Sequence, residues 1–162
     1  MFEYSFDLYR PNIGICLINR DQRIFCAKRI DYQNWQMPQG GVDFDENKNY
    51  DLYENLYREI YEEIGLLKNH FEILEKTDCM FYNFSENILK NIDKNVYGNI
   101  VGQQQIFFYL KFLGKDSDIN LNCYINPEFD DWKWETVSYI LESCIEMKKS
   151  IYEKVLSNFL YI

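Results

Sequence analysis

Residues 52–66 read LYENLYREIYEEIGL and are the part of the sequence that indicates the fold most clearly. Apolar side chains recur in it every four residues, at Leu52, Leu56, Ile60 and Ile64. This spacing predicts an amphipathic helix with one apolar stripe. Gly65 follows the stripe at the position where a left-handed glycine commonly ends a helix. We therefore expect a helix up to Ile64 that packs its apolar stripe on a core.

The same helix carries three carboxylates, those of Glu59, Glu62 and Glu63. At about 100° per residue they share one part of the helix surface, and Glu63 overlaps the apolar side. A solvated acidic face is the common meaning of such a cluster. Here, however, Glu59 and Glu63 are like charges one turn apart, and all three lie in the last two turns, where the helix dipole disfavours anions.

A hard divalent cation would reverse these penalties, because Mg²⁺ prefers carboxylate oxygens together with waters and substrate phosphates. We therefore interpret the cluster as a metal platform. Arg58 lies one turn before Glu62 and is placed to pair with that carboxylate or to orient it. An ordinary surface ion pair is the alternative interpretation of Arg58.

Around this helix the sequence predicts strands. Runs rich in apolar and β-branched residues occupy 13–19, 23–30, 71–76, 80–84, 105–113 and 131–135. The first two flank the polar Arg20-Asp21-Gln22 and predict a hairpin, and the first is apolar on both faces, as in the middle of a covered sheet. We expect loops over 35–41 (WQMPQGG) and 85–102.

A second helix is predicted at the end of the chain. Ser143 and Glu146 have the spacing of a capping box. An apolar stripe follows at Met147, Ile151, Val155 and Phe159. Strands on both sides of a central helix, with a closing helix, predict a layered α/β domain.

Composition limits the function. With 162 residues and 47% apolar residues the chain matches one globular domain. The net charge of −9 disfavours a long basic track for DNA or RNA. The five cysteines are scattered and His70 is the single histidine, so neither a disulfide framework nor a zinc site is supported. The chain shows no signal peptide and no long apolar run, so we expect a cytoplasmic protein without a membrane partner.

The stretch from Gly40 to Leu66 resembles the Nudix hydrolase box. That box is a glycine, five residues, a glutamate, seven residues and then R-E-U-x-E-E-x-G-U, in which U is apolar. The matching residues are Gly40, Glu46, Arg58-Glu59-Ile60, Glu62-Glu63, Gly65 and Leu66. Eleven residues, not seven, separate Glu46 from Arg58. The four extra residues equal about one helical turn, so they either lengthen the helix or enlarge the loop before it, and they put the role of Glu46 in doubt.

Further stretches along nearly the whole chain are similar to the subfamily of RNA 5′ pyrophosphohydrolases and dinucleoside polyphosphate hydrolases. They are 9–14 (YRPNIG), 35–41 (WQMPQGG), 102–105 (GQQQ), 127–129 (PEF) and 132–134 (WKW). The resemblance implies a single Nudix domain over 1–162 with an α/β/α sandwich around a mixed β-sheet. It also implies a divalent cation, Mg²⁺ or alternatively Mn²⁺, between the box helix and a substrate pyrophosphate.

The resemblance implies residue roles as well. The metal ligands would be Glu59, Glu62, Glu63 and the carbonyl of Gly40, with Arg58 beside them in the catalytic set. Glu128, in the Pro-Glu-Phe stretch, would bind metal or take the proton from the attacking water. The substrate-binding residues would be Arg10, Arg29, Gln103, Met147 and Lys148. Plain surface charges are the alternative for Arg10 and for Lys149, the second residue of a basic pair with Lys148.

Two departures bear on the substrate. Met147 stands where bacterial relatives commonly carry a phenylalanine that packs on a base, and methionine stacks less well. Gln104 and Ile106 stand where relatives usually carry basic residues. These changes suit engagement of a 5′ end alone, or of a free nucleotide, rather than a long RNA.

The first hypothesis is therefore a Mg²⁺-dependent pyrophosphohydrolase that converts the 5′ triphosphate or diphosphate end of RNA to a monophosphate, as in mRNA decay. The alternative keeps the chemistry and changes the substrate to dinucleoside polyphosphates such as diadenosine tetraphosphate. A third hypothesis is a non-catalytic nucleotide-binding module whose site is spoiled by the insertion. The sequence indicates neither an oligomeric state nor protein partners.

Overall fold

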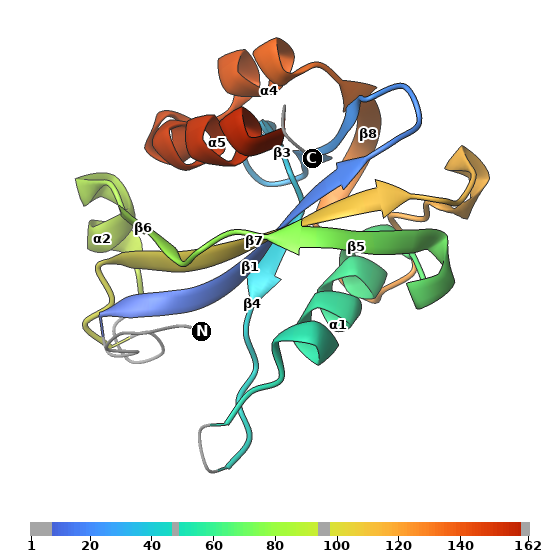
Figure 1. Cartoon of the computed structure of the whole chain (residues 1–162). Coiled ribbons are helices and arrows are strands. Elements are labelled where there is room, and N and C mark those ends of the chain that lie inside the picture. Colours follow the sequence, from blue (N-terminus) through green and yellow to red (C-terminus); the bar gives the residue numbers. More distant parts are fainter. Residues whose placement is uncertain (1–7, 47–48, 94–97, 160–162) are drawn as a thin grey trace.

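A mixed β-sheet forms the middle layer of the computed structural model, which describes residues 8–46, 49–93 and 98–159. Helix α1 lies on one face of the sheet, and α4 and α5 lie on the other (Figure 1). The strands are β1 Tyr9–Ile18, β2 Ile24–Arg29, β3 Trp35–Gln36, β4 Gln39–Gly41, β5 Phe71–Lys76, β6 Met80–Asn83, β7 Gly102–Phe112 and β8 Phe129–Glu135. The α-helices are α1 Leu52–Ile64, α2 Glu86–Asn91, α4 Val137–Ser143 and α5 Glu146–Phe159, and short 3₁₀ turns occupy Lys68–His70 and Asp116–Asp118.

The central strands of the sheet are β1 and β7. The main strand order is β3-β2-β1-β7-β5, while β4 also pairs with β1, β6 with β7 and β8 with β2. The pair β1–β7 is parallel, in register from Tyr9 opposite Gly102 to Ile18 opposite Lys111, whereas the other strand pairs are antiparallel. The prediction that the first strand lies in the middle of a covered sheet is confirmed, because β1 is buried from Pro11 to Ile18.

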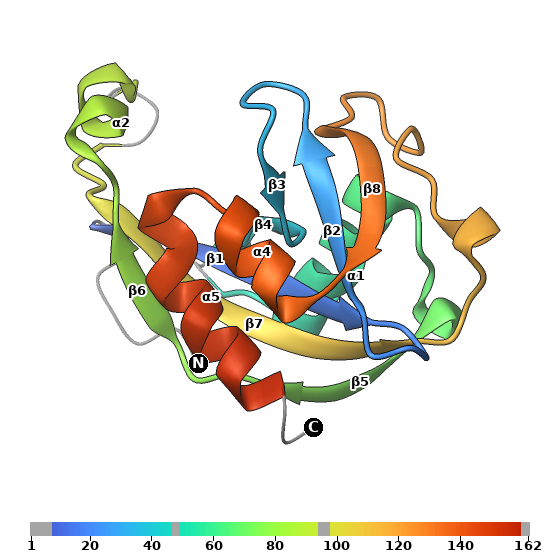
Figure 2. The same ribbon diagram turned by 90° about the horizontal axis from the view of Figure 1, so that it is seen from above.

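Alternate residues of the central strands fill two separate cores. On one face Ile13, Ile15 and Leu17 pack with the apolar stripe of α1. On the other face Cys16 and Ile18 pack with Ile151, Val155 and their neighbours on α5. Figure 2 shows α5 crossing over the sheet on that second face. The layered α/β/α architecture expected from the sequence is thus confirmed.

Helix α1 ends where its sequence predicts, at Ile64, and it begins at Leu52, a start that the sequence analysis did not specify. The carboxylate of Asp51 caps its start by accepting the backbone N–H groups of Tyr53 and Glu54, at 2.8 and 3.0 Å. At its end Gly65 has φ 74°, and its N–H donates to the carbonyl of Tyr61. A side chain there would be strained and would also meet the backbone of Asn120.

Three segments differ from the sequence predictions. Residues 35–41 form β3 and β4 on either side of Pro38, rather than a loop, because β2 and β1 pair with them. The predicted loop 85–102 contains α2, capped by Ser85, and residues 94–97 lie outside the described part. The predicted capping box is wrong, since Ser143 ends α4, a helix that was not predicted, and its hydroxyl donates to the carbonyl of Ile140.

Within the described ranges, none of the helices has both the length and the apolar character needed to cross a membrane.

Candidate functional site

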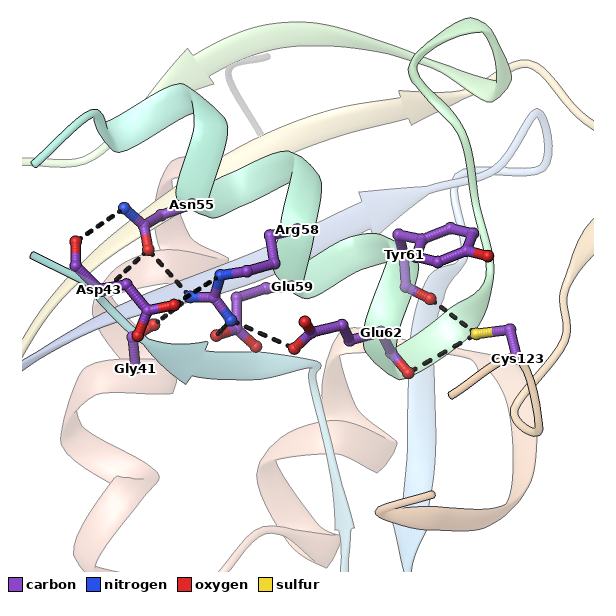
Figure 3. A network of polar contacts seen from close by, with 8 residues as sticks. All are labelled: Gly41, Asp43, Asn55, Arg58, Glu59, Tyr61, Glu62 and Cys123. Carbon is purple, nitrogen blue, oxygen red and sulfur yellow. Dashed lines mark hydrogen bonds and ion pairs between the residues drawn. The ribbon is translucent and has the colours of Figure 1, made fainter. Parts of the chain in front are cut away.

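Arg58, in the middle of α1, is the centre of a polar network that joins this helix to the segment around Gly41 and Asp43 (Figure 3). Its guanidinium forms ion pairs with three carboxylates and donates to two further oxygens. These partners are Glu59 (2.7 Å), Glu62 (3.2 Å) and Asp43 (3.0 Å), then the carbonyl of Gly41 (2.8 Å) and the amide oxygen of Asn55 (2.9 Å). The pairing of Arg58 with Glu62 that the sequence predicts is confirmed. Arg58 therefore fixes two of the candidate ligands relative to β4.

Asn55 and Asp43 belong to this network and were missed by the sequence analysis. Asn55 is buried on α1, and its amide oxygen accepts the N–H of Asp43 at 2.7 Å. The Asn55 amide also donates to the carbonyls of Asp43 and Asp51. The only sequence signal was a polar residue beside the apolar stripe, one turn before Glu59. Together the two residues fasten the segment before α1 to the helix.

The added length between Glu46 and Arg58 leaves this arrangement intact. Helix α1 begins only at Leu52, so Glu46 lies outside the helix, and its side chain is exposed. The Glu62 side chain remains partly exposed and still faces Arg58. The carboxylate face of α1 is therefore formed, while a role for Glu46 stays a prediction.

Glu59 and Glu63 are buried carboxylates, with 7% and 5% of their surfaces exposed. Burial raises the pKa of Glu59 to about 7 in spite of the Arg58 guanidinium, with smaller contributions from Glu62 and Glu128. Burial likewise raises the pKa of Glu63 well above its ordinary value, and the charges of Glu59 and Glu128 add to the rise. The negative charge of Glu128 raises the pKa of both side chains, which indicates that Glu128 lies near the carboxylates of α1.

These residues fit a hard divalent cation. Both carboxylate oxygens of Glu63 are buried without a hydrogen-bond partner of good geometry, an uncommon state for a polar group. Gly40 lies so close to Glu59 that a Cβ atom there would collide with the carboxylate. Arg58 holds one oxygen each of Glu59 and Glu62, and among the described residues no group of three or more His, Cys, Asp or Glu side chains is arranged to hold a metal ion. The types of donor nevertheless fit Mg²⁺, because carboxylate and carbonyl oxygens are the ligands that it prefers.

At pH 8, replacing Glu63 by glutamine should stabilise the metal-free protein by about 1 kcal/mol, because it removes an acid that burial makes costly to ionise and whose oxygens lack a hydrogen-bond partner of good geometry. Adding Mg²⁺ should raise the Tm of the unaltered protein and leave that of Glu63→Gln nearly unchanged. Thermal unfolding with EDTA and with Mg²⁺ measures both effects. Equal Mg²⁺ shifts in the two proteins would show that Glu63 does not bind the metal.

A cleft of about 620 Å³ lies between the sheet and α5. All five substrate-binding residues that the sequence indicates line it, namely Arg10, Arg29, Gln103, Met147 and Lys148. They come from β1, β2, β7 and α5, segments that are far apart in the chain. Gln104 and Ile106 do not line the cleft, because they are buried in the sheet, where the Gln104 amide donates to the carbonyl of Tyr9. The neutral side chains at these two positions therefore do not reduce the positive charge of the cleft, which comes from Arg10, Arg29 and Lys148.

Arg29 links this cleft to Glu128. Its guanidinium makes two hydrogen bonds of 2.7 Å to Asp31 and one of 2.6 Å to Glu128. The N–H of Ile30 also donates to the carbonyl of Glu128 at 3.0 Å. Nearly half of the Glu128 side chain is exposed, so its carboxylate is open to solvent. The structure thus brings together one predicted substrate residue and the predicted second acid.

Lys148 and Gln36 present unusual donors at the cleft. The ammonium of Lys148 is buried and donates to the amide oxygen of Gln36 at 2.8 Å. The buried amide nitrogen of Gln36 has no hydrogen-bond partner. The amide nitrogen of Asn34, which lines the same cleft, has none either. The sequence analysis missed Gln36 and Asn34, since only the folded chain shows that their amide nitrogens are buried. Unpaired donors call for an acceptor-rich ligand such as a phosphate.

Lys148 predicts a pH dependence of substrate binding. Burial and Arg29 lower its pKa to about 7, although Glu63, Cys144 and Glu128 oppose this. Lys148 is therefore charged below about pH 7, and KM for a polyphosphate should rise several-fold as pH increases from 6 to 8.5. Because the folded pKa lies below that of the unfolded chain, protein stability should instead increase with pH above about 7.

Steady-state kinetics across this pH range checks the prediction. Lys148→Met should show a high KM whose pH dependence is much reduced, and Lys154→Met, an exposed position on the same helix, should behave as the unaltered protein. A KM profile of the same shape in all three proteins would contradict the prediction.

Comparison with known proteins gives one family and a set of similar structures. The NUDIX domain family model matches residues 8–157. The crystal structure of a C. elegans Ap4A hydrolase binary complex has a TM-score of 0.66 at 16% identity, covering 94% of this chain and 99% of that one. The E. coli dihydroneopterin triphosphate pyrophosphohydrolase has a TM-score of 0.69 at 14% identity, covering 93% and 99%.

A third similar structure, an ADP-ribose pyrophosphatase from Streptococcus suis, has a TM-score of 0.59 at 16% identity, covering 94% of this chain and 90% of that one. At such identities these structures show a shared fold. The family match is a separate finding, because it spans the box helix, the central strands and the cleft together. With that match and the carboxylate face of α1 in place, the chain belongs to the Nudix domain family.

Proposed function

We propose that the protein is a pyrophosphohydrolase that depends on a divalent cation and cleaves the polyphosphate of a nucleotide. One observation carries the proposal: the carboxylates of α1 and Glu128 adjoin a cleft that holds Arg10, Arg29 and Lys148. Cations in such a cleft bind phosphate, and acidic oxygens beside it bind metal. The names of the three similar structures, which refer to Ap4A, dihydroneopterin triphosphate and ADP-ribose, support a nucleotide-like substrate.

The residue roles follow from their positions. Glu59, Glu62, Glu63 and the carbonyl of Gly40 would hold Mg²⁺, with Mn²⁺ as a substitute. When bound, the metal neutralises phosphate charge and lowers the pKa of water. Arg58 orients Glu59 and Glu62.

Glu128, solvent-exposed and held by Arg29, is the proposed acceptor of the water proton. The water oxygen forms a new P–O bond, one P–O–P bridge breaks, and the leaving phosphate takes the electron pair of that bond.

Two substrate classes fit this cleft. The first is the 5′ triphosphate or diphosphate end of RNA, and the second is a dinucleoside polyphosphate. Both present a nucleoside joined to several phosphates, and Met147 together with Tyr82 and Phe84 gives the cleft an apolar part for a base. We disfavour a non-catalytic module, because the four acidic side chains are present, and the charge of Glu128 raises the pKa of both Glu59 and Glu63.

The purified protein with Mg²⁺ should release phosphate products from a short 5′-triphosphorylated RNA, from diadenosine tetraphosphate, or from both. A higher kcat/KM on RNA would support a role in RNA 5′ processing, and a higher value on the dinucleotide would support nucleotide clearance. Turnover of neither substrate with Mg²⁺ or Mn²⁺ would refute the proposal. Tight nucleotide binding by calorimetry without turnover would support the binding module instead.

A further inference from the structure

Carboxamide side chains from three strands meet on the face of the sheet that carries the cleft. Gln105 of β7 is at their centre and is fully buried. Its amide nitrogen donates to the side-chain oxygens of Asn12 on β1 at 2.6 Å, of Gln39 on β4 at 3.2 Å and of Gln103 at 3.4 Å. Gln39 and Gln103 line the cleft, and Gln105 lies behind them. Gln105 therefore contacts residues of the cleft without lining it.

Gln105 is polar where the next residues on the same face of β7 are apolar. Phe107 and Tyr109 follow it at alternate positions and belong to the core beneath α5. The buried amide oxygen of Gln105 has no hydrogen-bond partner among the described residues. A buried polar group without a partner costs about 1–3 kcal/mol, and an apolar side chain of the same size would avoid that cost. Stability alone therefore does not account for Gln105, which points to a role in holding its partners.

Strand β4 has one face toward the cleft and the other toward the carboxylates of α1. Gln39 lines the cleft, and a Cβ atom on Gly41 would meet the guanidinium of Arg10, another lining residue. Gly40 lies between them and faces the opposite way, since a Cβ atom there would collide with the carboxylate of Glu59. A displacement of β4 on the cleft side would therefore also move Gly40 relative to Glu59.

The backbone of β4 contacts the polar groups of α1 as well. The carbonyl of Gly41 accepts a hydrogen bond of 2.8 Å from Arg58, as Figure 3 shows. Burial raises the pKa of Glu63, and the backbone N–H of Gln39 opposes this rise, so that N–H lies beside the Glu63 carboxylate. Strand β4 is only three residues long and pairs with β1. Because so short a strand forms few backbone hydrogen bonds, the contact of Gln39 with Gln105 contributes to its position.

We propose that Gln105 is a positioning residue for the metal site: through Gln39 it holds β4 so that Gly40, the proposed carbonyl ligand, stays against Glu59. The inference rests on the metal ligands of the proposed function. Gln105 itself would touch neither the metal nor the substrate. Residues that orient metal ligands in this indirect way typically change metal affinity by about 10- to 100-fold when they are replaced.

Mn²⁺ binding to the nucleotide-free protein, followed by the electron paramagnetic resonance of the free ion, tests the inference without turnover. Gln105→Met keeps the side-chain volume and removes the carboxamide, so Kd for Mn²⁺ should rise by about tenfold or more. The matched control is Gln104→Met, at the next residue of β7, which is equally buried and donates to the carbonyl of Tyr9. This control should keep Kd within about twofold of the unaltered value. An unchanged Kd in Gln105→Met, or an equal rise in both variants, would overturn the inference.

Gln39→Ala breaks the same link from the other strand. Gln39 is half-buried, so a smaller side chain there should not prevent folding, and Kd for Mn²⁺ should again rise. The double variant should bind no more weakly than the worse single variant, because one link can be lost only once. An unchanged Kd in Gln39→Ala would overturn the inference even if Gln105→Met failed to fold, and so would fully additive effects.

The same measurements separate this inference from the proposed function. The expected Mn²⁺ affinities in a protein that hydrolyses neither the RNA nor the dinucleotide would refute the proposed function and leave the inference standing. Turnover of a substrate with unchanged Mn²⁺ affinity in Gln105→Met would do the reverse. An unaltered protein that binds no Mn²⁺ would refute the metal site and the role of Gln105 with it.

Discussion

Glu62→Gln should lower kcat for hydrolysis of a nucleotide polyphosphate by about 10²- to 10³-fold, the usual cost of losing one electrostatic contact to the transition state. Glutamine keeps the shape of the side chain and can still accept a hydrogen bond from Arg58, so the protein should remain folded. The loss of the negative charge, however, should lower the affinity of the site for the divalent cation. Phosphate release at saturating substrate and Mg²⁺ measures the effect.

The matched control is Glu54→Gln, on the same helix. The Glu54 side chain is largely exposed and pairs only with the equally exposed Lys68 in the described contacts. This change should leave kcat within about twofold of the unaltered value, because exposed ion pairs contribute little. Similar rates for Glu62→Gln and the unaltered protein would remove Glu62 from the list of metal ligands.

Arg58→Met should lower the free energy of unfolding of the metal-free protein by about 3 kcal/mol, as expected when a buried charge loses its partner. The variant leaves Glu59 buried without its cation and breaks the links to Asp43 and to the carbonyl of Gly41. Urea unfolding in EDTA measures the difference in the free energy of unfolding between the variant and the unaltered protein. Arg23→Met, at an exposed arginine, should change stability by less than about 0.5 kcal/mol.

The loss in Arg58→Met should depend on pH. In the folded protein the pKa of Glu59 is already raised to about 7, and without Arg58 it would rise further. A folded pKa above the unfolded value means that stability falls as pH increases through that window. The difference between Arg58→Met and the unaltered protein should therefore be small at pH 5 and large at pH 8. A difference independent of pH would show that Arg58 acts through packing alone.

The sequence by itself was sufficient for the features that depend on neighbouring residues. Helix α1 was predicted with its end at Gly65, because apolar spacing and glycine conformation are local properties. Strand β5 was predicted with its observed bounds, and β6, β7 and β8 were located to within a few residues. The angular position of Glu63 placed it over the apolar side of the helix, and the side chain is indeed buried.

The secondary structure of short segments depended on the segments with which they pair. Strands β3 and β4 exist because β2 and β1 offer them backbone hydrogen bonds, which two- and three-residue runs do not reveal in advance. Helix α4 was missed, and Ser143 was assigned to the wrong helix, because a serine can cap one helix or end another.

Two features depended on the tertiary structure: which polar groups of the cleft lack a hydrogen-bond partner, and which acids lie close enough to shift one another's pKa. Lys148 meets Gln36 across 112 positions of the chain, and Arg29 meets Glu128 across 99. Such contacts, and the burial that moves the pKa of Lys148 and Glu59 toward 7, arise only when segments that are far apart in the chain pack together. The sequence determined which residues are candidates for the chemistry that we propose. Burial, which depends on the whole fold, shifts the pKa of the candidates Glu59, Glu63 and Lys148.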